Sequence, residues 1–195
     1  MGYKLIIDTS NRMLSVGIAD DYEVIYKKQY EAWQRQSEFT IKEIDIALKS
    51  LNILPSSLDE IIVGKGPGSY TGIRIALTIG KVMSYALNIP LKTISSLQTL
   101  CGLLPKCMAI IDARSDRAYV GIYDKGEAII KDSIQYLSDI PNIANENGIV
   151  NFVGEVNLIG KEVKDIDIVE NMYLISKLIA PETNVNVVTP QYLKG

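Results

Sequence analysis

The segment GKGPGSYTGIR, which spans residues 64–74, is the most informative part of this sequence for predicting the fold. It follows an apolar stretch typical of a buried strand and runs directly into a predicted helix at residues 71–87. Free backbone amides at such a junction, together with the helix dipole, make it a candidate anion cradle. The segment lacks the ending of a Walker loop, and the third glycine of a dinucleotide-binding fingerprint would fall on Thr71. The alternative is a structural loop, in which glycine serves positive φ angles and close backbone approach.

Strands and helices alternate on both sides of this segment. The predicted elements of the first hundred residues are strands at 3–8, 13–19 and 23–30, a helix at 37–51, a strand at 60–64, a helix at 71–87 and a strand at 91–95. The first two strands flank a polar turn, which is typical of a hairpin. This order predicts an α/β fold with a mixed sheet.

A glycine and a proline interrupt the pattern between residues 99 and 106, where we place a boundary. The predicted strands beyond it are 108–112, 118–123, 127–131 and 149–153, before a weakly patterned tail. We therefore expect an amino-terminal lobe at residues 1–100 and a smaller carboxy-terminal lobe at residues 101–195.

The composition narrows the class of protein. Hydrophobic residues make up 47% and charged residues 22% of the 195 residues, which is typical of a folded protein. The net charge of -3 and a pI near 5.1 argue against a protein that binds nucleic acid without a partner, because neutralising phosphates needs a basic surface. Histidine is absent, which excludes His-dependent triads, His metal sites and His acid–base pairs.

Cysteine spacing and hydropathy favour a cytoplasmic protein. Cys101 and Cys107 match no zinc or redox spacing, so we expect two reduced, buried thiols. Asp8 interrupts the first apolar stretch early, which argues against a secretory signal. No apolar run approaches the roughly 18 residues that a membrane span needs. We therefore expect a cytoplasmic location and no membrane association.

The predicted helix at 71–87 is apolar around most of its circumference. Gly72, Ala76 and Gly80 recur at every fourth residue, so a second backbone could approach closely along this ridge. A helix that is apolar on more than one side must be covered on more than one side. The cover is either the chain itself or a partner subunit, and the residues alone leave both open.

Two polar segments are candidates for chemistry. Asp8, Thr9 and Ser10 place a carboxylate and two hydroxyls at a turn, where phosphotransferases hold magnesium and phosphate. The alternative is a turn capped by its own side chains. Residues 112–117 (DARSDR) alternate acids and arginines, which predicts ion pairs within a turn unless they serve a site.

Taken together, these segments resemble the bacterial TsaB (YeaZ) family. The resemblance is carried by LIIDTS at 5–10, the glycine segment at 64–74, ISSL at 94–97, DAR at 112–114 with Tyr119 and Tyr123 after it, and PQYL at 190–193. These motifs spread over the whole chain in the family's order. The glycine segment is highly specific, whereas each of the others alone is a weak signal.

The resemblance implies an actin-like, sugar-kinase-like (ribonuclease H-like) fold with two related lobes, the second reduced. It also implies a role in attaching a threonylcarbamoyl group to the adenosine beside the anticodon in tRNAs that read codons starting with A. In that family a homologous TsaD-like subunit does the transfer, and a small TsaE-like ATPase completes the assembly. The TsaB-like member is a non-catalytic scaffold and activator.

Further expectations about partners and site residues follow from the resemblance. Family members alone tend to form homodimers through amino-terminal lobe helices, and tRNA is met through the complex. We expect no intrinsic cofactor, with room for ATP or ADP at the contact with the catalytic partner, and we assign no catalytic residue and no metal site. The predicted subunit interface comprises Ile41, Ile44, Leu48, Gly72, Ile73, Ala76, Leu77, Gly80 and Met83. The family-motif residues, which include the candidate anion loop, are Asp8, Thr9, Ser10, Gly66, Gly68, Ser69, Thr71, Arg74, Asp112 and Arg114.

Two departures from the family and two alternative functions complete the expectations. Many relatives carry a histidine after an arginine near the first helix, but Gln36 follows Arg35 here, and the second lobe lacks a glycine pair like that of an adenosine-binding motif. An ATP-dependent phosphotransferase is one alternative, although residues 112–114 lack the glycine of a second phosphate hairpin. A glycoprotease-like peptidase is the other, but the sequence offers no catalytic apparatus for it.

Overall fold

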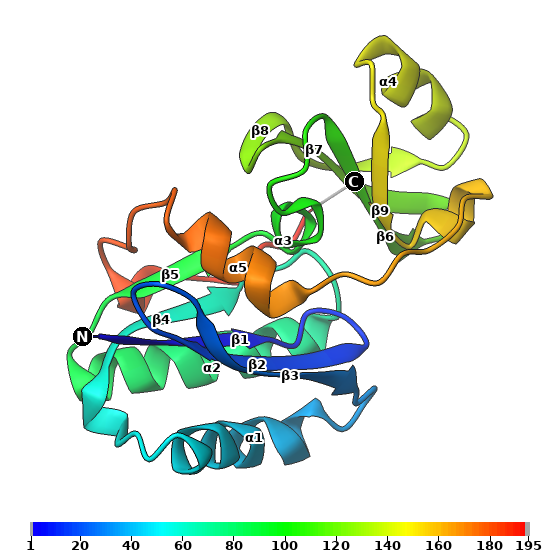
Figure 1. Ribbon diagram of the computed structural model, residues 1–195. Helices are drawn as coiled ribbons and strands as arrows, with labels where there is room; N and C mark the ends of the chain where they lie inside the picture. Colours follow the sequence, from blue (N-terminus) through cyan, green and yellow to red (C-terminus); the bar gives the residue numbers. More distant parts are fainter. Residues whose placement is uncertain (1, 194–195) are drawn as a thin grey trace.

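The computed structural model of this chain describes residues 2–193, which form two β-sheets (Figure 1). The first sheet has the strand order β3-β2-β1-β4-β5. Strand β1 pairs antiparallel with β2 and parallel with β4, so the predicted mixed sheet is confirmed. The strands of this sheet are β1 (Tyr3–Asp8), β2 (Met13–Ala19), β3 (Val24–Glu31), β4 (Leu58–Gly64) and β5 (Leu91–Ile94).

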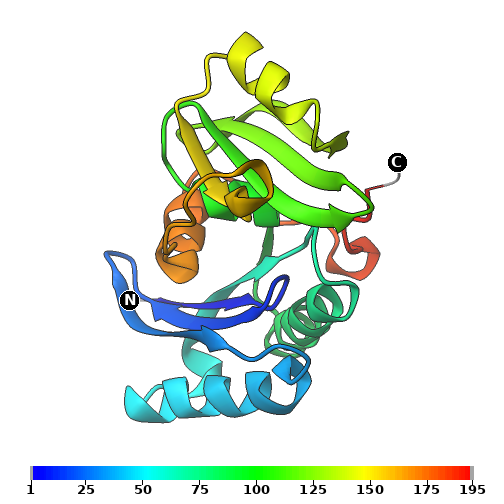
Figure 2. The ribbon, with the colours of Figure 1, turned by 90° about the vertical axis from the view of Figure 1, so that its right-hand side faces the viewer.

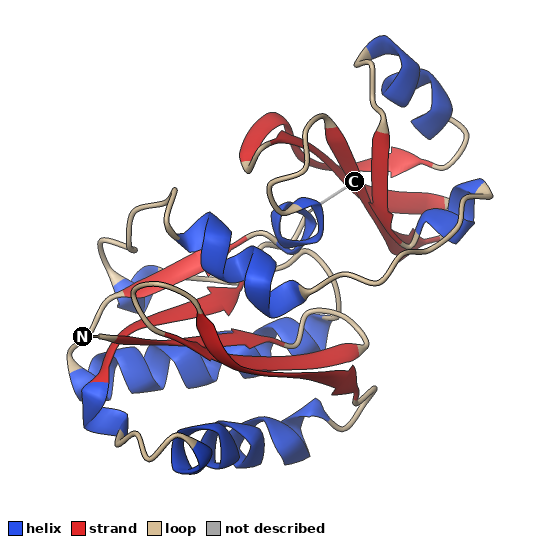
Figure 3. Cartoon of the chain, viewed as in Figure 1, coloured by secondary structure: helices blue, strands red, loops and turns tan. Residues whose placement is uncertain are grey.

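Helices cover both faces of the first sheet, as Figures 2 and 3 show. They are α1 (Gln36–Ser50), α2 (Tyr70–Leu87) and α5 (Ile168–Ser176). Alternate residues of β1 serve the two faces: Leu5 and Ile7 join the core with α1 and α2, whereas Ile6 joins the core with α5. All three side chains are fully buried. The central strand is therefore apolar throughout, as expected for a strand covered on both faces.

The second sheet has the strand order β8-β7-β6-β9. It is smaller than the first, and its two faces are also covered by apolar side chains. Its strands are β6 (Cys107–Arg114), β7 (Arg117–Asp124), β8 (Glu127–Tyr136) and β9 (Asn151–Gly154). Ala109 and Ile111 of β6 face the core shared with α5, whereas Met108 and Ile110 pack with α4 (Ile140–Glu146). One apolar core therefore joins the two sheets, and a separate core lies on the far face of the second.

Helix α3 (Ser96–Cys101) connects the two sheets. Ser95 caps it by accepting the Leu97 amide at 3.2 Å. Cys101 and Cys107 are both buried and free, as expected from their spacing. Three short 3-10 helices lie in the connections at Pro55–Ser57, Val156–Ile159 and Val185–Val187, the last of which is η3.

The last part of the chain returns to the first sheet (Figure 1). Val169 and Met172 of α5 are fully buried in the core that joins the two sheets. Val185 and Val188 pack against the core beneath α1 and α2. The division of the chain at residue 100 stays a prediction, but residues after 160 contribute to both lobes.

Most elements of the first hundred residues lie where the sequence predicts them. Three helices were missed, namely α3, α4 and α5, and β8 extends to Tyr136 instead of ending at residue 131. The predicted α/β fold class is confirmed by the mixed first sheet with helices on both faces and by the second, smaller sheet. Within residues 2–193, no helix is both long and apolar enough to span a bilayer.

The position of α2 on the sheet depends on close contact with the turn after β1. The Thr9 hydroxyl donates to the Gly72 carbonyl oxygen at 2.6 Å and accepts the Ala76 amide at 3.2 Å. A Cβ atom at residue 72 would lie 1.9 Å from the Thr9 carbonyl oxygen. Glycine is therefore required at residue 72 by the backbone contact itself.

Gly72→Ala tests this contact. Alanine normally stabilises a helix interior by about 1 kcal/mol relative to glycine. Here it must push Thr9 away, so we expect the free energy of unfolding in urea to fall by about 2 kcal/mol or more. The control is Thr71→Ala, at the exposed neighbouring residue, which should change stability by less than about 0.5 kcal/mol. An unchanged or increased stability of the Gly72 variant would contradict the contact.

Candidate functional site

The glycine loop between β4 and α2 is anchored to the β1–β2 turn. The Ser69 amide donates to the Ser10 carbonyl oxygen at 2.7 Å. Gly68 has a φ of +149, and a Cβ atom there would lie 2.2 Å from the same Ser10 oxygen. Gly66, with a φ of +95, accepts the Ser96 amide at 2.9 Å and so ties the loop to α3. These glycines serve positive φ angles and close backbone approach.

Some donors of the candidate anion cradle are used within the chain. Besides the Ser69 amide, the Gly72 amide donates to Ser69 Oγ at 3.2 Å and the Ile73 amide donates to the Ser69 carbonyl oxygen at 2.9 Å. An anion would have to displace the Ser10 carbonyl oxygen to reach the Ser69 amide. These contacts support the structural interpretation of the loop, and the anion cradle stays a prediction.

Asp8 is sealed beneath this loop. Its side chain is 2% exposed, and Oδ2 accepts the Ser10 hydroxyl at 3.0 Å and the Asn11 side-chain amide at 3.4 Å. Oδ1 has no hydrogen-bond partner among the described residues and lies against Gly64, where a Cβ atom would come within 2.0 Å of it. A magnesium ligand needs open coordination positions on the carboxylate, so Asp8 does not fit that role.

Burial also changes the acidity of this carboxyl group. Loss of solvation raises the pKa of Asp8 from its ordinary value of 3.8 to about 6, and the hydrogen bonds from Ser10 oppose part of the rise. The ionised form is therefore unfavourable in the folded state. Near neutral pH this carboxylate lowers the stability of the fold and has no access to a ligand.

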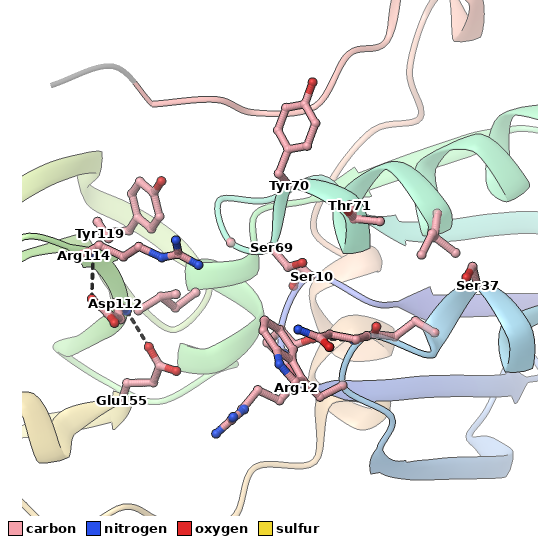
Figure 4. Close-up of a pocket in the computed structure, with 18 residues that line it drawn as sticks. Ser10, Arg12, Ser37, Ser69, Tyr70, Thr71, Asp112, Arg114, Tyr119 and Glu155 are labelled. Atoms are coloured by element: carbon pink, nitrogen blue, oxygen red, sulfur yellow. Dashed lines mark hydrogen bonds between the residues drawn. The ribbon is translucent and has the colours of Figure 1, made fainter.

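A cavity of about 810 Å³ opens between the two lobes beside the glycine loop (Figure 4). The first lobe contributes Ser10, Ser69 and Thr71 to its lining, and the second contributes Arg114 and Tyr119. Arg12, Asp112 and Glu155 also line it, so its charges are mixed. Within residues 2–193, no three potential metal-ligating side chains gather at one place. The cavity has the position of an interlobe cleft but lacks a cluster of carboxylates.

The segment at residues 112–117 forms the tight turn between β6 and β7. Asp112 Oδ1 accepts the Arg114 amide at 2.7 Å, and the Asp112 amide donates to the Glu155 carboxylate (Figure 4). Arg114, Ser115 and Asp116 all have positive φ angles, between 54° and 65°. No ion pair forms within this segment among the described residues, so the expected pairing of its acids and arginines is wrong. A backbone turn closed by Asp112 takes its place.

Arg74 lies outside the cavity, on an exposed face of α2. Its Nε atom donates to the Tyr192 hydroxyl at 2.7 Å, and its guanidinium group lies 4.0 Å from the centre of the Tyr70 ring. These contacts raise the pKa of Arg74, the bond to Tyr192 first among them. This motif residue therefore binds the end of the chain and does not reach the cleft.

The predicted interface residues divide into two groups. Ile41 is 57% exposed and Met83 is half-buried. The others are buried inside the chain: Ile44, Leu48, Gly72, Ile73, Ala76, Leu77 and Gly80.

The small-residue ridge of α2 therefore needs a correction. A Cβ atom at Gly80 would lie 2.5 Å from Val63 Cγ1 of β4, and Ala76 is fully buried in the core with α1. The ridge lets α2 approach its own sheet closely and is closed to a second chain. An arginine at residue 76 or 80 would disrupt folding before it could report on association.

The open apolar surface lies on the other side of these helices. Val82 of α2 is 61% exposed, and Ile79, three residues before it, is half-buried. Ile75, one turn further back, is half-buried and lines the interlobe cavity. We call Ile41, Ile79 and Val82 the outer helical face. Of these residues, only Ile41 belongs to the interface predicted from the sequence. The three-residue spacing of Ile79 and Val82 on α2 was the available signal for the others.

Asp8→Asn tests the buried carboxyl group. A raised pKa in the folded state contributes stability that is fully present below about pH 3.8 and is lost as the pH rises through about 6. Asparagine keeps the shape without the charge, so it should stabilise the fold at pH 7.5 by on the order of 2 kcal/mol and have little effect near pH 4. The control is Asp165→Asn at an exposed residue. A stability difference independent of pH in urea unfolding would refute the assignment.

Comparisons with known proteins agree with this architecture. The family model described as "TsaD: tRNA N6-adenosine threonylcarbamoyltransferase" matches residues 30–152, which is more than half of the chain. The Bacillus subtilis tRNA threonylcarbamoyladenosine biosynthesis protein TsaB is 33% identical over 134 residues, covering 65% of this chain and 57% of the relative. Its Escherichia coli counterpart is 29% identical over 132 residues, covering 63% and 55%. The chain thus spans little more than half the length of these two curated relatives.

Solved structures match the whole fold. YeaZ from Pseudomonas aeruginosa superposes with a TM-score of 0.80 at 18% identity, covering 99% of this chain and all of that one. A second Pseudomonas aeruginosa structure, described as similar to peptidase YEAZ, has a TM-score of 0.82 at the same identity and covers both chains completely. At this identity the structural likeness speaks for the fold alone. With the family model and the curated relatives, it places the chain in the TsaD-related group of proteins, where it belongs to the TsaB (YeaZ) family.

Proposed function

We propose that this chain is a non-catalytic scaffold and activator in the formation of N6-threonylcarbamoyladenosine in tRNA. The modified adenosine is the one beside the anticodon in tRNAs that read codons starting with A. Family membership supports the pathway, because relatives carry tRNA threonylcarbamoyladenosine biosynthesis in their names. Because the proposed substrate is tRNA, we also propose a cytoplasmic location.

The observation that carries the scaffold role is the outer helical face. Ile41 and Val82 are 57% and 61% exposed, on two helices that pack against each other. Isolated exposed apolar residues are common, but here half-buried Ile79 lies one helical turn from Val82 and enlarges its apolar surface. Apolar side chains at the centre of a contact surface are typical of subunit interfaces.

The proposed occupant of this face is a TsaD-like catalytic subunit of related fold. Two homologous lobes can pair through equivalent helices, much as two copies of one chain pair in a symmetric dimer. The same face would form a homodimer when the partner is absent. A TsaE-like ATPase completes the assembly, ATP or ADP binds at the contact with the catalytic partner, and tRNA is met through the complex.

The transfer chemistry belongs to the partner in this proposal. The chain has no histidine, and Asp8, the carboxylate at the end of β1, is sealed under the glycine loop. Both facts also speak against the alternatives. A phosphotransferase of this fold needs an accessible metal-binding carboxylate, and a peptidase needs a nucleophile with an activating base or a metal.

Reconstituted tRNA threonylcarbamoylation tests the function. The catalytic and ATPase subunits of the same organism are incubated with tRNA, ATP and the threonylcarbamoyl donor, with or without this chain. Product formation should depend on the chain, with a rate at least about tenfold lower in its absence. Equal product without it, from partners verified as active, would refute the accessory role.

Val82→Arg tests the interface separately. A charge placed at the centre of an apolar contact should weaken binding of the TsaD-like subunit at least about tenfold, because the arginine must be desolvated without a partner. Val150→Arg is the matched control, since Val150 is 72% exposed and lies in the second lobe before β9. Calorimetry measures both affinities, and circular dichroism checks both folds. Equal affinities for the two variants would place the interface elsewhere.

A further inference from the structure

A late segment of the chain, which includes η3, runs along α2 and is tied to both lobes. We call residues 184–192 the C-terminal strap. Lys81 Nζ of α2 donates to two strap carbonyl oxygens, those of Asn186 at 3.1 Å and Val188 at 2.8 Å. Further on, the Gln191 amide donates to the Lys65 carbonyl oxygen in the glycine loop at 2.8 Å. The strap therefore follows the first lobe from the carboxy-terminal half of α2 to the glycine loop.

At Gln191 the strap also reaches the second lobe. The Gln191 side-chain amide donates to Asp132 Oδ2 of β8 at 2.8 Å. The same carboxylate accepts the Ser95 hydroxyl at 2.5 Å and the Tyr123 hydroxyl at 2.5 Å. Burial and the nearby Asp132 raise the pKa of Tyr123, so its hydroxyl stays a donor. One carboxylate thus gathers donors from β7, the residue that caps α3, and the strap.

The final contact of the strap clamps the first turn of α2. The Tyr192 ring stacks on the Tyr70 ring with 5.2 Å between the ring centres, and its hydroxyl accepts the Arg74 Nε–H at 2.7 Å. Tyr70 is the first residue of α2 and lines the interlobe cavity. The strap therefore contacts Tyr70, a residue that also lines the interlobe cavity.

These contacts are mostly polar and lie at or near the surface. Val185 and Val188 are only partly buried, and Tyr192 is 43% exposed. Segments held by few buried apolar contacts open at low free energy while the core stays folded. Bonds to charged groups are stronger than bonds between neutral groups, and the strap has such bonds to Lys81, Arg74 and Asp132. Of these, the contact between Gln191 and Asp132 is the one that reaches the second lobe.

We propose that the C-terminal strap is a releasable tie that couples the second lobe to the glycine loop and the first turn of α2. When docked, Gln191 bonds Lys65 in one lobe and Asp132 in the other, so the lobes cannot part without breaking this residue's contacts. When released, the strap uncovers the Arg74 and Lys81 face of α2 and loosens the glycine loop. All contacts of the tie lie within this chain, so the proposal stands whether or not the proposed function holds.

Hydrogen exchange measured by mass spectrometry on the full chain tests the tie. Gln191→Glu places two carboxylates together, which should release the strap. We expect exchange to become about tenfold faster at residues 184–193 and also at 64–72, while α1 (Gln36–Ser50) stays unchanged. Faster exchange in the strap alone would overturn the coupling. Unchanged exchange in both segments would overturn the tie itself.

A polarity swap controls for nonspecific damage. In the double variant Asp132→Asn with Gln191→Glu, the new amide can donate to the new carboxylate while its oxygen still accepts the Tyr123 hydroxyl. Ser95 can rotate its hydroxyl to accept from the amide. Exchange at residues 64–72 should return to within about threefold of the wild-type rate. Failure of the swap to slow exchange, in a protein that is folded by circular dichroism, would overturn the assignment of this contact.

Two further variants keep the test decisive. If Gln191→Glu unfolds the whole chain, Lys81→Met removes both bonds to the strap carbonyl oxygens without adding a like charge. It should speed exchange about threefold in the strap and in residues 64–72, and wild-type rates in both would overturn the proposal. Glu127→Gln, at an exposed carboxylate on the same strand as Asp132, is the matched control and should change neither segment.

Discussion

The β1–β2 turn and the amino end of α2 meet in a close backbone contact that positions both lobes. The carbonyl oxygens of Thr9 and Ser10 occupy the places where side chains at residues 72 and 68 would otherwise project. This contact seats α2 on the first sheet. Because Gly66 also bonds the start of α3, the same loop sets where the chain leaves for the second sheet. A displaced turn would therefore move both lobes.

Local pattern was sufficient for the strands and for the two long helices, but not for the rest of the fold. Helix α5 was missed because Val169, Met172 and Ile175 are all fully buried at its place between the sheets, so it presents no clear polar face. Helices α3 and α4 span only six and seven residues, too few for a periodicity to stand out. Their positions depend on tertiary contacts that no short window of sequence contains.

The candidate site shows the same division between pattern and context. An apolar ridge at every fourth residue indicates burial, but it does not indicate what does the burying, and at Gly80 the neighbour is Val63 of the chain's own sheet. The glycine motif correctly marked the loop, yet only the structure reveals that the Ser10 carbonyl oxygen fills it. The contacts of Asp132 join it to Ser95 and Gln191, which are 37 and 59 residues away in sequence. No motif connects these positions before the chain is folded.

Two features of this chain lower the stability of its fold. Burying Asp8 with one oxygen unpaired costs stability, and so does keeping Ile41 and Val82 in water. The first leaves Asp8 beneath the glycine loop, out of reach of a metal ion. The second leaves apolar side chains on the outside of α1 and α2. An apolar outer surface is suited to holding another protein, so this second feature, which weakens the fold in isolation, is one that a subunit contact would use.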